Sequence, residues 1–217
     1  MDLKEGVIKF DLKFTPAPPL PPEDLREINA WRRILRLLGL TGQDPERYDG
    51  LGYGNISRLI EPFDAPAPRR RFVISGTQTG GLGDLNEEHY ALVTECEPER
   101  NRVVAEGPIR PSSEALTHGA LYQADSSLRF VMHVHSPEIW RRALELGIPL
   151  ADEKAAYGTP DMAAEVRRVL GEPSVRDGRI FAMGGHEDGL VAFGRTAADA
   201  GSVLVNLLAR AFELSGS

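Results

Sequence analysis

The segment Leu128–His135 constrains the fold most, because its run of apolar residues is almost unbroken. A strand that is apolar on both faces is covered on both sides, so we expect it at the centre of a sheet. Residues 90–95 and 102–105 flank a turn-forming stretch and predict a hairpin. Because several predicted strands follow one another without an intervening helix, we expect one α/β domain with helices around a mixed, largely antiparallel sheet.

The other elements follow from hydrophobic periodicity and from helix start and stop signals. We expect further strands at 7–14, 56–60, 71–75, 180–183 and 190–193, and helices at 23–38, 112–124, 137–146, 160–170 and 196–214. Five prolines within residues 15–22 predict a stiff, extended connector. We therefore divide the chain into an N-terminal strand and Pro-rich connector, 1–22, and a domain, 23–217.

Charge and cysteine content exclude several classes of protein. The chain has 25 Lys and Arg residues against 32 Asp and Glu residues, a formal net charge of −7. It shows no basic stripe, so a nucleic-acid partner is not expected. No apolar run reaches the roughly 18 residues of a membrane span, and residues 1–6 lack the apolar core of a signal peptide. With Cys96 as the single cysteine, these features indicate a soluble, cytoplasmic protein.

Three histidines lie at or shortly after the ends of predicted strands. His133 and His135 are two residues apart, so on a strand both project from the same face. They could be a pair of metal ligands or two partly exposed histidines at a strand end. His186 follows the strand 180–183 and is a weak signal alone; Glu187 and Asp188 beside it could orient a ligand or be solvated loop charges.

The start of the predicted helix 112–124 is rich in polar groups. The hydroxyls of Ser112 and Ser113 and the first N–H groups of the helix could hold a phosphate, or they could form an ordinary cap. Glu114 lies in the first turn, where a carboxylate is favoured. His118 lies four residues later on the same helix face, so it could support a neighbouring ligand from behind.

Two glycine-rich loops offer backbone N–H groups. Residues 52–57 and 75–81 do not match the known phosphate-loop patterns. Glycine allows the backbone to approach an anion closely, and successive N–H groups form a concave nest. Each loop, taken alone, is equally compatible with a tight turn.

Five short motifs occur in one order along the chain: GNIS at 54–57, TQTGG at 77–81, PSSE at 111–114, HVHSP at 133–137 and HEDGLVAFG at 186–194. Together they resemble the class II aldolase/adducin family. This resemblance implies a three-layer α/β/α sandwich around a largely antiparallel sheet, assembled as a homotetramer. It also implies a small-molecule substrate, a phosphorylated sugar.

The resemblance assigns a role to individual residues. Zinc would be bound by His133, His135 and His186, with Glu114 as a further ligand and the general base; another divalent transition metal could also occupy such a site. His118 would lie behind these ligands. The substrate phosphate would be held by Gly54, Asn55, Thr79, Gly80, Ser112 and Ser113.

The function implied is that of a zinc-dependent lyase that cleaves a small phosphorylated sugar by a retro-aldol reaction. The alternatives are another metal-dependent reaction of a sugar phosphate, namely epimerisation, dehydration or decarboxylation, or a non-catalytic adducin-like binding module. The chain departs from the family where an insert with a catalytic tyrosine normally follows the HxH helix. That insert is missing here, and Tyr157 cannot be mapped onto the tyrosine.

Overall fold

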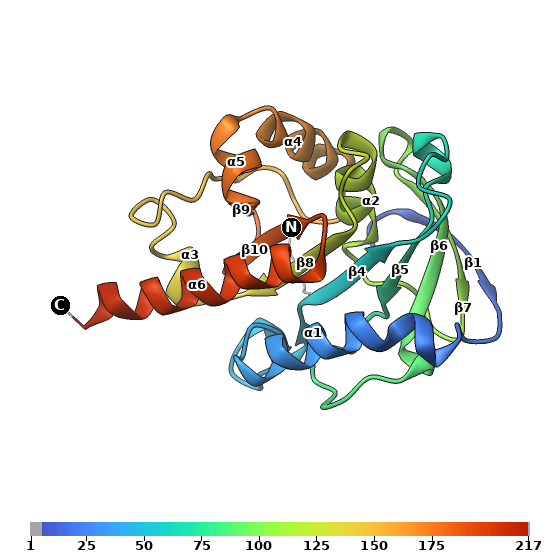
Figure 1. The fold of residues 1–217 in the computed structure, drawn as a ribbon, viewed down its shortest axis with the longest axis horizontal. Helices are drawn as coiled ribbons and strands as arrows, with labels where there is room; N and C mark the ends of the chain where they lie inside the picture. Colours follow the sequence, from blue (N-terminus) through green and yellow to red (C-terminus); the bar gives the residue numbers. More distant parts are fainter. Residues whose placement is uncertain (1–5, 217) are drawn as a thin grey trace.

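Eight strands form one sheet in the computed structural model, which describes residues 6–216, and their order is β1-β7-β6-β5-β4-β8-β10-β9 (Figure 1). Residues 1–5, at the start of the predicted N-terminal segment, and residue 217 lie outside the described part. The strands are β1 Asp11–Pro16, β4 Asn55–Leu59, β5 Phe72–Ser75, β6 Tyr90–Glu97, β7 Arg102–Gly107, β8 Phe130–His135, β9 Ile180–Ala182 and β10 Gly189–Gly194. Only β1 and β7 run parallel; the other neighbours are antiparallel, so the expected mixed sheet is confirmed.

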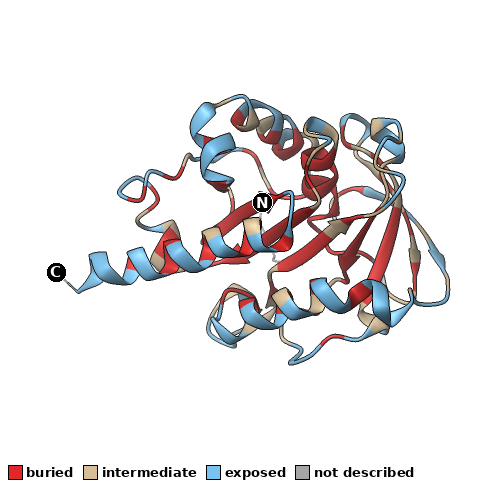
Figure 2. Cartoon of the chain, in the orientation of Figure 1, coloured by how far each residue is buried: buried red, intermediate tan, exposed pale blue. Residues whose placement is uncertain are grey.

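Strand β8 is central, as its apolar run predicts. It pairs with β4 on one side and β10 on the other, so that His133 lies between Asn55 and Val191. All six residues of β8 are buried. Figure 2 shows the middle of the sheet as the buried part of the molecule, with the outer surfaces of the flanking helices exposed.

Helices cover both faces of the sheet and complete three layers (Figure 1). Alternate residues of β8 enter two apolar cores: Val131 packs with α2, α4 and α5, whereas Met132 packs with α1, α3 and α6. The helices are α1 Arg26–Leu37, α2 Ala115–Ala124, α3 Pro137–Trp140, α4 Pro160–Leu170, α5 Pro173–Gly178 and α6 Ala197–Ser215. No helix among residues 6–216 is long and apolar enough to span a membrane.

The structure differs from the sequence-based prediction at several places. The helix expected at 112–124 begins only at Ala115, because Ala115 N–H donates to Ser112 O in a tighter turn, so Ser112 and Ser113 precede α2. The strand expected at 7–14 is β1 at Asp11–Pro16, because Asp11 pairs with Arg102, the first residue of β7, and earlier residues have no strand beside them. The helix expected at 137–146 ends at Trp140. Beyond it, Arg142 N–H and Ala143 N–H donate to carbonyls three residues earlier, which tightens the chain into turns. Helix α5 and the small sheet of β2 Gly42–Gln43 and β3 Gly52–Tyr53 were not anticipated.

Candidate metal centre

Two neighbouring strands bring three histidines together. His133 and His135 project from β8 toward α2, and His186 lies in the turn between β9 and β10. Because Gly189 at the start of β10 pairs with His135, this turn returns to the end of β8. One ring nitrogen from each histidine lies within 4.8 Å of the other two, and all three side chains are buried. The ligand set implied by the motifs is thus assembled in space.

A hydrogen bond fixes the orientation of the His133 ring. Its Nδ1 lies 3.1 Å from the carbonyl oxygen of Leu190, which can only accept, so Nδ1 donates there and Nε2 is the ring nitrogen that faces the other histidines. That Nε2 is 3.1 Å from Nε2 of His135. Two ligands on one tetrahedral zinc, each about 2.05 Å from the ion, would be roughly 3.3 Å apart. The observed separation therefore suits a shared cation.

Burial keeps the His135 ring neutral. Desolvation lowers the pKa of His135 well below its usual value, and His186, His133 and Arg47 lower it further. A neutral imidazole is the form that binds a transition metal, since a protonated ring has no lone pair to offer. The charge state of this side chain therefore matches the requirement of a metal ligand.

Glu114 directly precedes α2 and faces His186. Its Oε1 lies 3.4 Å from His186 Nδ1, and the side chain is 1% exposed. Burial alone would raise the pKa of Glu114, but His133 and His186 outweigh it and lower the pKa to about 2. Within residues 6–216 neither carboxylate oxygen has a partner with full hydrogen-bond geometry, although His186 Nδ1 faces one of them. A buried, ionised carboxylate beside three imidazole rings fits a site for a cation.

His118 occupies a different position from the three histidines. Its Nδ1 is 2.7 Å from Ser57 Oγ, which is also 2.7 Å from the hydroxyl of Tyr122. The ring is completely buried, and desolvation lowers the pKa of His118 to about 3. His118 therefore lies in a neutral hydrogen-bonded group between α2 and β4. His118 lies one turn beyond Glu114, and its direct partner is Ser57, so its expected role behind the metal ligands stays a prediction.

The loops predicted to bind phosphate lie side by side. Gly76 forms a bridge with Pro111, and Ser112 N–H donates to Ser75 O at 3.2 Å, which joins the TQTGG and PSSE segments. Asn55 is the register partner of His133, so the GNIS segment borders the histidines.

Close packing explains one glycine of these loops. A Cβ at Gly80 would lie 2.3 Å from Tyr53 O, so only glycine allows the 76–81 loop to meet the 52–54 loop.

The polar side chains of the predicted phosphate site are buried and partly engaged. Thr79 Oγ1 donates to Gly76 O at 2.8 Å, and Ser112 Oγ accepts from Glu114 N–H at 3.2 Å. Asn55 Oδ1 has no hydrogen-bonding partner within residues 6–216. Gly54 has a φ of +78°, which favours glycine. The remaining members of the predicted set, Gly80 and Ser113, belong to the same adjoining loops.

Asp188, which the sequence offers as a residue that could orient a ligand or as a solvated loop charge, is buried on the His135 side, and its partners Arg47 and Tyr48 were not anticipated. The Arg47 guanidinium lies 3.0 Å from Asp188 Oδ2, and the Tyr48 hydroxyl donates to the same oxygen at 2.7 Å. The Tyr48 ring packs edge-on against His135, with centroids 4.6 Å apart. Arg47 thus offsets the negative charge of Asp188. Because Arg47 and Asp188 are far apart in the sequence, no local motif signals this pair.

Tyr157 is the second residue whose place the sequence does not reveal. Its ring stacks on His186, with centroids 4.6 Å apart and planes 28° apart, and it is 1% exposed. The loop that carries it is wedged between two others. A Cβ at Gly158 would lie 2.5 Å from Ser113 O, and one at Gly185 would lie 2.6 Å from Ala155 O. Tyr157 therefore forms one wall of the centre.

Comparison with known proteins agrees with this fold. Residues 44–214 match the family model of the Class II Aldolase and Adducin N-terminal domain. The chain therefore belongs to the class II aldolase/adducin family. A search of curated proteins finds no match.

Several solved structures share the fold at low sequence identity. L-fuculose-1-phosphate aldolase from Thermus thermophilus is 18% identical, with 86% of this chain and 89% of that chain covered and a TM-score of 0.59. A sugar-phosphate aldolase from Thermotoga maritima is 14% identical, with 88% and 93% covered and a TM-score of 0.66. YgbL from Klebsiella pneumoniae is 16% identical, with 91% of each chain covered and a TM-score of 0.63.

Proposed function

We propose that the protein is a zinc-dependent lyase that cleaves a small phosphorylated sugar by a retro-aldol reaction. The observation that carries this proposal is the buried group of His133, His135 and His186 with the Glu114 carboxylate 3.4 Å from His186. Three imidazoles and one carboxylate form a donor set typical of zinc. The membership of the family and the aldolases among the structural neighbours support the reaction class.

His133, His135 and His186 would hold the ion, and Leu190 O fixes the orientation of His133. Bound zinc supplies a Lewis acid that stabilises negative charge on sugar oxygens. Glu114 is ionised at neutral pH, so it can accept the proton that a retro-aldol cleavage releases and return it to the other fragment. Burial keeps water away from this proton transfer.

The adjoining loops would hold the phosphate. Backbone N–H groups of residues 78–81 and the hydroxyls of Ser112 and Ser113 are the donors that we assign to it, since Gly76 N–H and Thr77 N–H already donate to His89 O and Arg110 O. A phosphate fixed there would set the distance from the anchored end of the sugar to the histidines. We predict that Ser112→Ala combined with Ser113→Ala raises KM for phosphorylated substrates far more than for unphosphorylated ones; an equal loss for both would contradict a phosphate site.

A second reaction class shares this machinery. The fold is also that of YgbL, for which aldolase, epimerase or decarboxylase activity has been proposed. In an epimerase, dehydratase or decarboxylase the same histidines and Glu114 would act on a related sugar phosphate. A non-catalytic binding module is disfavoured, because such a protein has no need for three buried histidines and an ionised, buried carboxylate in one place.

The test is a substrate screen with the Glu114→Gln variant. Zinc-loaded protein is incubated with a panel of ketose and aldose phosphates, and aldehyde release, epimer formation and CO₂ release are followed. We expect aldehyde release from at least one sugar, and a loss of about 10²-fold or more in Glu114→Gln with zinc still bound. Glu145→Gln, at an exposed position, is the matched control. Aldehyde release that survives in Glu114→Gln would remove Glu114 from the mechanism, and products of another type would favour the second class.

A further inference from the structure

The segment ahead of β1 reaches the candidate metal centre. The chain bends at Phe10, and residues 6–9 lie against Tyr157 and the 77–78 loop. Val7 N–H donates to the Tyr157 hydroxyl at 3.3 Å, and Thr77 Oγ1 donates to Gly6 O at 3.4 Å. This segment precedes the part of the chain that matches the family model, which starts at residue 44. The contact therefore joins a segment outside the matched residues to a loop inside them.

Lys9 adds a cation to the Tyr157 ring. Its Nζ lies 3.3 Å from the ring centroid and is shielded from solvent. The same ring stacks on His186. A cation over an aromatic face is attracted by the ring quadrupole, and the attraction strengthens when the cation is desolvated. Tyr157 is thus held between the N-terminal segment and a proposed metal ligand.

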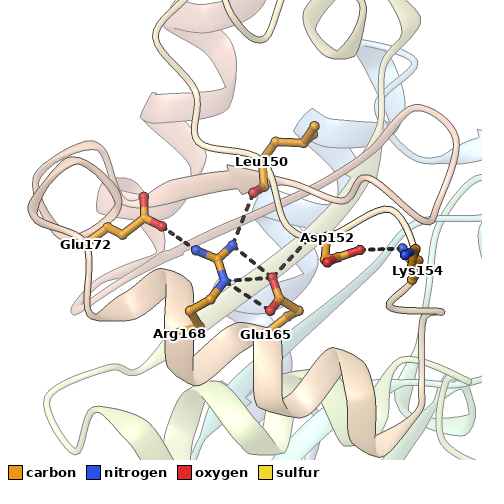
Figure 3. A network of polar contacts seen from close by, with 6 residues as sticks. All are labelled: Leu150, Asp152, Lys154, Glu165, Arg168 and Glu172. Atoms are coloured by element: carbon orange, nitrogen blue, oxygen red, sulfur yellow. Dashed lines mark hydrogen bonds and ion pairs between the residues drawn. The ribbon is translucent and has the colours of Figure 1, made fainter.

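The loop that carries Tyr157 is fixed at both ends. Figure 3 shows the first anchor, where Arg168 of α4 donates to Leu150 O at 3.4 Å and forms an ion pair with Glu165. The Glu165 carboxylate also accepts a hydrogen bond from Asp152 N–H at 3.0 Å. At the far end, Thr159 caps α4 through Met162 N–H.

Between these anchors Ala151 N–H donates to Ala182 O at 2.8 Å, and Thr159 Oγ1 donates to Ala156 O at 2.6 Å. Residues 152–154 are exposed. The position of Tyr157 on His186 therefore depends on contacts with residues 6–9 as well as on packing against Ser113 and Gly185.

We propose that Lys9 is a positioning residue of the metal centre: together with Val7 it holds Tyr157 against His186 and keeps the 151–159 loop closed on this side of the centre. The proposal rests on the proposed function in one respect, namely that these histidines bind the metal. Lys9 does not touch the substrate or the ion in this role. It acts through the Tyr157 ring.

The first experiment measures loop opening in metal-free protein, so it does not depend on zinc. Amide hydrogen exchange of peptides that span 151–159 is compared in wild type, Lys9→Met, Lys9→Arg and Lys13→Met. Lys9→Met keeps an apolar stem but removes the charge, whereas Lys9→Arg keeps the cation. Lys13 lies in β1 with its side chain exposed, so Lys13→Met is the matched control.

We expect the amide hydrogens of this loop to exchange about threefold to tenfold faster in Lys9→Met than in wild type, and at close to the wild-type rate in Lys9→Arg and Lys13→Met. Exchange in Lys9→Met at the wild-type rate would overturn the proposal, and so would a failure of Lys9→Arg to restore protection.

The second experiment measures access to the histidines. Zinc-loaded protein is mixed with a chromophoric chelator, and the rate of zinc capture is compared with the equilibrium zinc affinity. If the loop opens more often, the chelator captures zinc faster. We expect capture about threefold to tenfold faster in Lys9→Met than in wild type, with the equilibrium zinc affinity within about twofold of wild type. Faster amide exchange in the loop without faster zinc capture would overturn the proposal that the loop closes the site. A wild-type chain that binds no zinc would refute the proposed function, while the exchange comparison would still decide the role of Lys9.

Discussion

The buried His118 predicts a specific dependence of stability on pH. Desolvation lowers the pKa of His118 to about 3 in the folded chain, against about 6.5 when the chain is unfolded. Between these values the unfolded state binds a proton that the folded state excludes, so stability is full above pH 6.5 and falls as the pH drops toward 3. The slope is about 1.36 kcal/mol per pH unit, which gives a loss of about 2 kcal/mol between pH 7.5 and pH 5.

Urea unfolding of metal-free protein at these two pH values tests the reasoning. His118→Asn removes the titrating ring but leaves an amide near Ser57, so its free energy of unfolding should fall by about 2 kcal/mol less than that of wild type over this interval. Ser57→Ala is the control, because it removes the 2.7 Å hydrogen bond but leaves His118 buried. Its free energy of unfolding should lie below that of wild type by the same amount at both pH values. Equal pH dependence in wild type and His118→Asn would refute the argument.

Two further predictions concern the loops around the centre. Gly80→Ala should lower the free energy of unfolding by about 1–3 kcal/mol in urea, because its Cβ would lie 2.3 Å from Tyr53 O. Gly83 has open space around it, so the free energy of unfolding of Gly83→Ala should stay within about 0.5 kcal/mol of wild type. Equal effects of the two substitutions would contradict the packing of the loops. Asp188→Asn should lower stability by about 1–2 kcal/mol in thermal unfolding, since it leaves Arg47, whose side chain is 31% exposed, without its counter-ion; an unchanged Tm would show that the pair contributes nothing.

Local sequence patterns predict the centre of the fold well. The apolar run of β8 places it between two other strands, and the spacing of His133 and His135 puts both on one face. The turn-rich stretch between β6 and β7 predicts their hairpin. These features depend on residues close together in the chain, where period and turn chemistry decide the structure.

Contacts between distant segments could not be predicted in the same way. Arg47 and Asp188 meet because the turn after β9 folds back beside β8, and neither residue has a neighbour that signals the pairing. Tyr157 lies on His186 because its loop is wedged against Ser113. The N-terminal segment alternates like a strand throughout, but pairing begins only at Asp11, where β7 offers a partner. In each case tertiary packing, rather than local preference, sets the position.

The most direct test of the account is the metal content of the protein, purified without a histidine tag or chelator. Wild type is compared with His133→Ala and with His89→Ala, a histidine outside the cluster. The account predicts about one zinc per chain in wild type and His89→Ala, and loss of the zinc in His133→Ala. Wild-type protein that carries no metal and binds none when zinc is added back would contradict it.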